Sequence, residues 1–270
     1  MARRRDRDRP AHVVPAGVRG AGGRQPLPLP PSGDRPGNGL MTPVPLLCFP
    51  PAGAGAGFYH DWRGVRPGLD VHGVELPGRE KRFAEPPLTA MTALVDDLVP
   101  GILDQTADRP EVVFFGHSFG ASVAYEVVRA LTAAGRTGLT LIVSGAAAPG
   151  TGTRPAITGL PDDEFVAGVR RIAGYRHPAL DDPELRELLL PALRADVTCQ
   201  EQYRPAPLPR LAVPVVALRG AADDLVTATD AARWSEVTDG RFIGAELPGG
   251  HMYLVDAAPV VLALVERSRG

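Results

Sequence analysis

A serine lies between two glycines at the end of an apolar run, in the segment Gly116-His117-Ser118-Phe119-Gly120. Residues 111–115 before it are typical of a buried strand. Apolar residues at helical spacing follow it, at Val123, Val127, Val128 and Leu131. At such a junction, G-x-S-x-G predicts a sharp turn from strand to helix that exposes the serine hydroxyl, because the glycines let strand and helix approach without Cβ clashes. The chain must therefore adopt a fold in which a buried strand runs directly into a helix.

Short apolar runs and helical periodicity alternate along the chain from Pro45 onward. Strands are predicted at residues 46–49, 71–76, 112–115, 139–144, 213–218 and 242–247. Helices are predicted at 91–103, directly after Ser118, and at 256–267. This alternation predicts an α/β fold with a doubly wound, mostly parallel sheet.

Two segments depart from the alternation. Residues 151–208 contain no convincing strand, and helices are predicted there at 162–172 and 183–203, so we expect a helical lid inserted between two strands. Residues 1–43 are rich in Gly, Pro and Arg and poor in large apolar side chains, which predicts a disordered N-terminal extension. Residues 44–270 are then expected to form one domain.

Charge and composition restrict the possible partners. Residues 1–43 carry eight arginines and three aspartates, a net charge of +5, so the remaining residues carry −7 of the total of −2. A negative folded part argues against nucleic acid as a partner. No apolar run approaches the roughly 18 residues of a membrane span, and none follows the basic start, so we expect a cytoplasmic protein without a membrane segment. Cys48 and Cys199 are too few for a zinc cluster and are expected to be buried, reduced thiols.

A serine nucleophile needs a general base, and the base needs a carboxylate to orient it. In G-x-S-x-G proteins of the α/β class the chain order is serine, acid, histidine, each after a strand. The run at 213–218 is followed by Asp223 and Asp224, and the run at 242–247 by His251 in a glycine-rich loop. We favour Asp223 as the acid, with Asp224 as a loop-end or helix-capping residue. Ser118, Asp223 and His251 are thus the predicted catalytic residues.

An oxyanion site needs two N–H donors. The N–H of Phe119, directly after the serine, is one candidate. The other is the N–H of Ala52, in the small-residue loop 49–55 after the first strand. A glycine-rich loop is also compatible with phosphate binding, but the chain has no G-x-x-x-x-G-K-[ST] segment, and its lone lysine lies elsewhere.

Taken together, several segments resemble the type II thioesterases that accompany polyketide synthases and nonribosomal peptide synthetases, across residues 44 to 265. The segments are Phe49-Pro50-Pro51-Ala52-Gly53, Leu76-Pro77-Gly78-Arg79-Glu80, the serine segment, Leu193-Arg194-Ala195-Asp196 with Tyr203, Gly220 to Asp223, and Pro248-Gly249-Gly250-His251. Two residues depart from the family pattern. Asp224 stands where proline is usual, and Met252 replaces the usual aromatic residue.

The resemblance implies an α/β-hydrolase that hydrolyses acyl thioesters carried on acyl or peptidyl carrier protein domains and so clears stalled or misprimed groups. It implies no metal and no cofactor of the enzyme's own, since phosphopantetheine belongs to the carrier. For Arg79, Glu80 and Asp196, structural salt bridges are at least as plausible as substrate contact. Two alternatives remain open, namely a chain-releasing thioesterase or small-molecule ester hydrolase, and a catalytically silent module that docks carrier proteins.

Overall fold

The structure is a computed structural model that describes residues 42–151, 156–173, 178–206 and 209–269. The predicted disordered extension, residues 1–43, lies outside this range except for its last two residues. No helix in the described part of the chain combines the length and the apolarity that a membrane-spanning segment needs.

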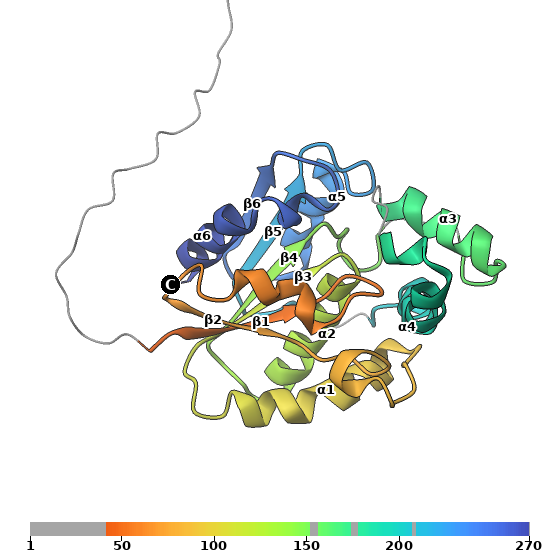
Figure 1. The fold of residues 1–270 in the computed structure, drawn as a ribbon. Helices are drawn as coiled ribbons and strands as arrows, with labels where there is room; N and C mark the ends of the chain where they lie inside the picture. The colour runs from red at the N-terminus through yellow and green to blue at the C-terminus, as the bar shows by residue number, and fades with distance from the viewer. Residues whose placement is uncertain (1–41, 152–155, 174–177, 207–208, 270) are drawn as a thin grey trace, which may run out of the picture. The chain divides into compact units, whose positions relative to one another are not determined.

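Six strands form one sheet in the order β2-β1-β3-β4-β5-β6 (Figure 1). The strands are β1 Val44–Phe49, β2 Leu69–Gly73, β3 Val112–His117, β4 Leu139–Ser144, β5 Val215–Gly220 and β6 Phe242–Leu247. Every neighbouring pair is parallel. The carboxyl ends of all six strands therefore lie at one edge, where ligand sites of open α/β sheets form. The predicted doubly wound α/β fold is confirmed.

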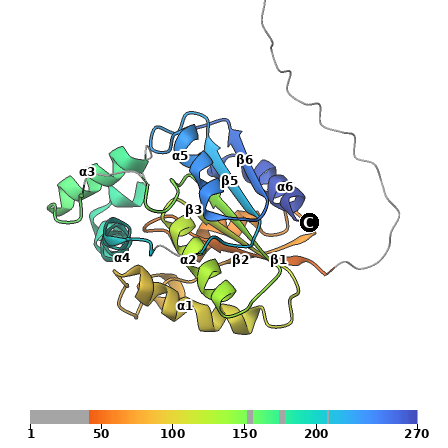
Figure 2. The ribbon, with the colours of Figure 1, turned by 180° about the vertical axis from the view of Figure 1, so that it is seen from behind.

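Helices cover both faces of the sheet because successive side chains of each central strand point to opposite faces. On β1, Leu47 and Phe49 pack in the cluster that includes α1 Met91–Gln105 and α2 Phe119–Ala133. Leu46 and Cys48 point the other way, toward the 3-10 helix η1 Ala56–Trp62 and α6 Ala258–Ser268. Figures 1 and 2 show α1 and α2 on one side of the strands and α6 on the other.

Four strands differ from the prediction at one or both ends, namely β1, β2, β3 and β5. Strand β5 starts at Val215 rather than at residue 213, because Pro214 has no N–H to donate to the ladder. Strand β2 ends at Gly73 rather than at residue 76. A Cβ on Gly73 would lie 2.2 Å from the carbonyl oxygen of Ala56, so η1 crosses the chain at this point. The apolar pattern marks which residues are buried but not where a crossing element ends the ladder.

The insertion between β4 and β5 is helical, as predicted. It contains α3 Asp162–Ala173, the 3-10 helix η3 Pro178–Leu180 and α4 Pro183–Gln202. These three helices are called the lid below. They share a small apolar cluster of their own, which comprises Ile157, Phe165, Val166, Leu180, Leu190 and Leu193. Two further short elements, α5 Ala228–Ala232 and the 3-10 helix η4 Arg233–Val237, lie between β5 and β6.

Candidate active site

Ser118 occupies a strained turn between β3 and α2. Its φ of 54° and ψ of −116° lie in a region that residues with a Cβ rarely adopt. The glycines on either side make the turn possible. A Cβ on Gly116 would lie 2.2 Å from the carbonyl oxygen of Gly120, and one on Gly120 would lie 2.2 Å from that of Phe49. The G-x-S-x-G spacing thus has the steric cause that the sequence predicts.

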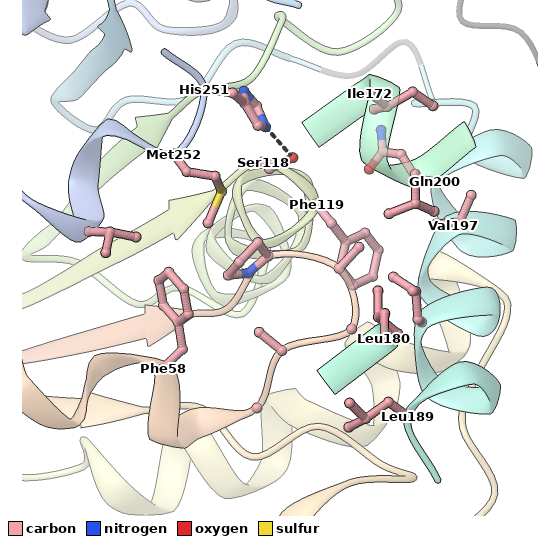
Figure 3. Close-up of a pocket in the computed structure, with 18 of the residues that line it drawn as sticks. Phe58, Ser118, Phe119, Ile172, Leu180, Leu189, Val197, Gln200, His251 and Met252 are labelled. Carbon is pink, nitrogen blue, oxygen red and sulfur yellow. Dashed lines mark hydrogen bonds between the residues drawn. The ribbon is translucent and has the colours of Figure 1, made fainter. Parts of the chain in front are cut away.

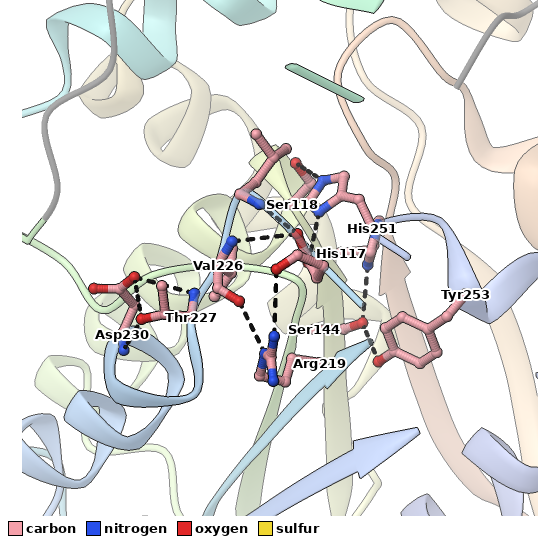
Figure 4. A network of polar contacts seen from close by, with 12 residues as sticks. His117, Ser118, Ser144, Arg219, Val226, Thr227, Asp230, His251 and Tyr253 are labelled. Atoms are coloured by element: carbon pink, nitrogen blue, oxygen red, sulfur yellow. Dashed lines mark hydrogen bonds and ion pairs between the residues drawn. The ribbon is translucent and has the colours of Figure 1, made fainter. Parts of the chain in front are cut away.

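The structure brings the three predicted catalytic side chains together. His251 Nδ1 lies 2.9 Å from Asp223 Oδ2, and His251 Nε2 lies 3.1 Å from Ser118 Oγ. Figure 4 shows the imidazole of His251 next to Ser118 at the carboxyl edge of the sheet. With the proton on Nδ1 donated to Asp223, Nε2 can accept the serine proton. Residues 133 positions apart in sequence therefore form one proton-transfer chain.

The carboxylate of Asp223 is held on both oxygens. Oδ1 accepts the backbone N–H groups of Leu225 (2.9 Å) and Val226 (3.2 Å), while Oδ2 faces His251. Burial opposes ionisation of Asp223, but these hydrogen bonds and the nearby imidazole outweigh it and hold the pKa of the carboxyl below its usual value. Asp223 is therefore ionised at neutral pH and stabilises a proton on His251.

Asp224 is exposed, unlike the buried Asp223 before it. Its alternative role as a helix cap is wrong, because Thr227 caps α5 and forms a reciprocal capping box with Asp230. The Thr227-x-x-Asp230 spacing is a sequence signal that could have identified this cap. Of the two neighbouring aspartates, only Asp223 contacts His251 in the structure.

Sequence reasoning missed a second layer of polar contacts around these residues. The side chain of His117 is buried against His251, with ring centroids 5.0 Å apart, and its Nδ1 lies 2.8 Å from Ser144 Oγ. Ser144 Oγ in turn lies 2.7 Å from the hydroxyl of Tyr253 (Figure 4). Burial, aided by the neighbouring His251, lowers the pKa of His117 well below its usual value. His117 is thus neutral and places no second positive charge beside the proton-transfer chain.

Arg219 was also not predicted, and no sequence signal singles it out. Although it lies on β5 and is buried, its guanidinium donates to the carbonyl oxygens of Val226 (2.9 Å) and Asp223 (3.3 Å). These two bonds hold the loop that carries the acid. A third contact, 2.6 Å to Glu246 Oε1, neutralises the buried charge.

The loop after β1 approaches the serine from the other side. A turn is closed by the N–H of Ala54 and the carbonyl oxygen of Pro51, at 3.0 Å, and Gly53 within it has a φ of +78°. Ala52 and Phe119, the two predicted oxyanion donors, both line the cavity that contains Ser118. Phe119 is the first residue of α2, and the first N–H groups of a helix have no partner within it.

The cavity has a volume of about 620 Å³. Figure 3 shows Ser118 and His251 among its lining residues, with Phe58 and Met252 on one side and the lid residues Leu180, Leu189 and Val197 on the other. Met252, which departs from the family pattern, is thus part of the cavity wall. Among the described residues, no group of three or more His, Cys, Asp or Glu side chains is placed to hold a metal ion.

The lid is tied to the segment after β2 by a buried ion pair and to the loop after β1 by a backbone hydrogen bond. Arg79 Nη2 donates to Asp196 Oδ1 at 2.8 Å, and Asp196 Oδ2, which also accepts from Arg79 Nη1, accepts the N–H of Gly53 at 2.8 Å. The side chain of Leu193, one turn earlier on α4, packs directly against Gly53. Arg79 and Asp196 thus have the structural role that the sequence analysis allowed, and they fix the loop that carries Ala52.

Asp196→Asn is expected to lower the free energy of unfolding by about 3–5 kcal/mol, because it leaves the buried guanidinium of Arg79 without a counter-charge. The matched control is Asp162→Asn, which removes the partner of Arg194 on the same helix. That pair is at the surface, with the Asp162 side chain 65% exposed, and its loss should cost less than about 1 kcal/mol. Urea denaturation measures both. Equal losses of unfolding free energy in the two variants would contradict the structural role of the Arg79–Asp196 ion pair.

Fold and site together define a serine hydrolase of the α/β-hydrolase class. A family model described as a thioesterase domain matches residues 44–268, and the chain belongs to this thioesterase family, whose members act on thioesters.

Similar proteins point to one branch of the family. A probable cadicidin biosynthesis thioesterase of Streptomyces griseus is 37% identical over 78% of this chain, which spans only 58% of that protein. Thioesterase PikA5 of Streptomyces venezuelae is 36% identical over 79% of this chain and 76% of its own length. The solved structure of the type II thioesterase BorB, from the borrelidin biosynthetic cluster, is 37% identical, with a TM-score of 0.78 over 85% of this chain and 94% of its own. The resemblance to type II thioesterases is confirmed.

Proposed function

We propose that this protein hydrolyses acyl thioesters held on the phosphopantetheine arm of carrier protein domains, and so clears stalled or misprimed acyl groups in polyketide or nonribosomal peptide biosynthesis. The observation that carries the proposal is the hydrogen-bonded series Asp223, His251 and Ser118 at the floor of a largely apolar cavity beneath the lid. Such a cavity suits an acyl chain, and the series suits its covalent transfer to the serine.

In the first half-reaction, Ser118 Oγ attacks the thioester carbonyl carbon while His251 Nε2 takes the hydroxyl proton. The oxyanion accepts from the N–H groups of Ala52 and Phe119. As the carbonyl re-forms, the carbon–sulfur bond breaks and the pantetheine thiol leaves with the proton from His251. Because a thiolate is a good leaving group, this step makes only a modest demand for general-acid catalysis.

In the second half-reaction, a water molecule gives a proton to His251 and attacks the acyl-serine carbonyl. Ser118 leaves and recovers its proton, and the free acid is released. Asp223 stays ionised throughout and holds the imidazole in the orientation that serves both steps. The chemistry as proposed needs only these side chains, two backbone N–H groups and water, without a metal ion or a cofactor of the enzyme's own.

Docking of an acidic carrier requires local positive charge, since the residues after 43 carry a net charge of −7. Three lid arginines do not supply it freely, because Arg170, Arg186 and Arg194 are each paired with an aspartate. Arg171 on α3 and Arg204 after α4 are exposed and have no ion pair among the described residues. These two arginines are the candidates for contact with a carrier.

The test is incubation with carrier proteins loaded with a panel of acyl groups, with mass spectrometry to follow the loss of each group. Hydrolysis of short acyl groups with release of the free acid would support the proposal. A marked preference for long, mature chains, or release of a cyclic product, would favour a chain-releasing thioesterase instead. Binding of carriers without any loss of acyl groups would favour a silent docking module.

Short acyl groups are expected to be hydrolysed with higher kcat/KM on a carrier protein than on free pantetheine or coenzyme A, by about tenfold or more. Binding energy from the carrier, remote from the carbonyl, can align the lid and the phosphopantetheine arm and so lower the barrier of the chemical step. One acyl group is measured on all three thiols. Equal kcat/KM on the three would remove carrier docking from the proposal.

A further inference from the structure

Two neighbouring polar residues, Gln200 and Glu201, end the apolar wall that α4 presents to the cavity. Leu189, Leu193, Val197 and Gln200 all line it, at positions that recur along one face of a helix. The first three are apolar, and the fourth ends in an amide. Figure 3 shows Gln200 projecting from α4 toward the cavity, close to Ile172. Of the α4 residues labelled there, Gln200 lies nearer to Ser118 and His251 than Leu189 does. The wall that α4 contributes to the cavity is therefore apolar until it reaches Gln200 and Glu201.

The other polar residues on this side of the cavity already have partners. Glu201 accepts the N–H of Ile157 (2.6 Å) and both the N–H (3.3 Å) and the hydroxyl of Thr158. The guanidinium of Arg170 donates to Asp181. Gln200 differs, because its amide oxygen is buried and has no hydrogen-bond partner among the described residues. Gln200 thus lines the cavity with a side-chain amide whose oxygen the described part of the protein leaves unsatisfied.

A buried amide oxygen without a partner is destabilising, by about 1–3 kcal/mol. Leucine at this position would continue the apolar stripe without that cost. An amide carries both a donor and an acceptor, and rotation about its last bond can present either to a ligand. A ligand group with a hydroxyl would satisfy it.

We propose that Gln200 is a specificity-determining residue that selects hydroxyacyl groups, through a hydrogen bond between its amide and a hydroxyl on the acyl chain. The inference rests on the proposed function, since it assigns the acyl chain to the part of the cavity beneath the lid. A neutral hydroxyl fits a neutral amide better than a charged substituent does, and the guanidinium of Arg170 on the lid is already paired with Asp181. The preferred substrates are therefore short hydroxyacyl thioesters rather than unsubstituted acyl thioesters of equal length.

The test compares two carrier-bound thioesters that differ by one oxygen, 3-hydroxybutyryl and butyryl. The wild type is expected to hydrolyse the hydroxylated group with about tenfold higher kcat/KM, which corresponds to one net hydrogen bond. Gln200→Leu should lower kcat/KM for 3-hydroxybutyryl by about the same factor and raise it for butyryl, because leucine completes the apolar wall. Retained hydrolysis of butyryl also shows that the variant is folded.

Gln202→Leu is the matched control, since Gln202 lies on the same helix but is exposed and does not line the cavity. It should leave the ratio of the two substrates unchanged. An equal ratio in wild type and Gln200→Leu would overturn the role of Gln200 while leaving the proposed function intact. Failure of the wild type to hydrolyse either thioester would instead overturn the proposed function, and the assignment of Gln200 with it.

Discussion

Ser118→Ala is expected to abolish thioester hydrolysis and to leave the fold unchanged. Removal of a nucleophilic serine from such a triad lowers kcat by a factor on the order of 10⁵–10⁶, because oriented water cannot replace the covalent step. Alanine keeps the small Cβ that the strained turn already accommodates. The backbone of the turn is held by Gly116, by Gly120 and by the N–H of residue 118, which donates to the carbonyl oxygen of Ser144 at 2.8 Å. Single-turnover hydrolysis of an acyl carrier measures the loss.

Ser122→Ala is the control for this experiment. Ser122 lies one turn further along α2, is buried, and does not line the cavity. Both variants should keep the circular dichroism and melting temperature of the wild type, and only Ser118→Ala should lose activity. The intact protein should also form an acyl-enzyme intermediate visible by mass spectrometry, and the variant should not. Undiminished hydrolysis by Ser118→Ala would refute its assignment as the nucleophile.

The fold and the placement of the three side chains could be predicted because local physics and tertiary structure agree there. Buried parallel strands need continuous apolar runs, and the four central strands β1, β3, β4 and β5 are buried along their whole length. The edge strands β2 and β6 are only partly buried. The turn at Ser118 needs glycine on both sides, because a Cβ at either position would collide with backbone. The G-x-S-x-G pattern therefore predicts the turn directly. His251 follows the last strand, where the parallel arrangement places it at the same edge as Ser118.

The supporting contacts could not be predicted, because they join residues that no periodicity relates. Arg79 and Asp196 lie 117 positions apart, and only the approach of α4 to the segment after β2 makes them a pair. Arg219 lies on a buried strand, where an apolar residue is expected, and its role depends on the path of the loop that follows. His117 lies next to Ser118 in sequence, but its contact with Ser144 depends on the register of β3 against β4.

The choice between Asp223 and Asp224 also could not be made from the sequence. Spacing along the chain cannot separate Asp223 from Asp224, because either could follow the strand into the loop. In the structure the N–H of Asp223 donates to the carbonyl oxygen of Gly220 at 3.1 Å, within a tight turn at the strand end. The turn directs Asp223 inward, where it is 4% exposed, and Asp224 outward. The geometry of one turn therefore selects the acid.

Asp223→Asn is expected to lower kcat by a factor on the order of 10⁴, and Asp224→Asn to leave it near the wild-type value. An asparagine at residue 223 still accepts the N–H groups of Leu225 and Val226 through its carbonyl oxygen, so the loop keeps its shape. Its amino group then faces His251 Nδ1 and favours the tautomer with the proton on Nε2. That tautomer cannot accept the proton of Ser118. The substitution also removes the negative charge that stabilises the imidazolium.

The comparison is informative because the two variants make the same chemical change one residue apart. Pre-steady-state acylation of Ser118 should be slowed in Asp223→Asn alone, while melting temperatures of the two variants differ little, since both keep the backbone of the loop. Asp223→Glu adds a third point, because it restores the charge but moves the carboxylate by one methylene, and we expect partial recovery of kcat. If Asp224→Asn were the slower enzyme, the loop would have to turn over in solution and present the other carboxylate to His251.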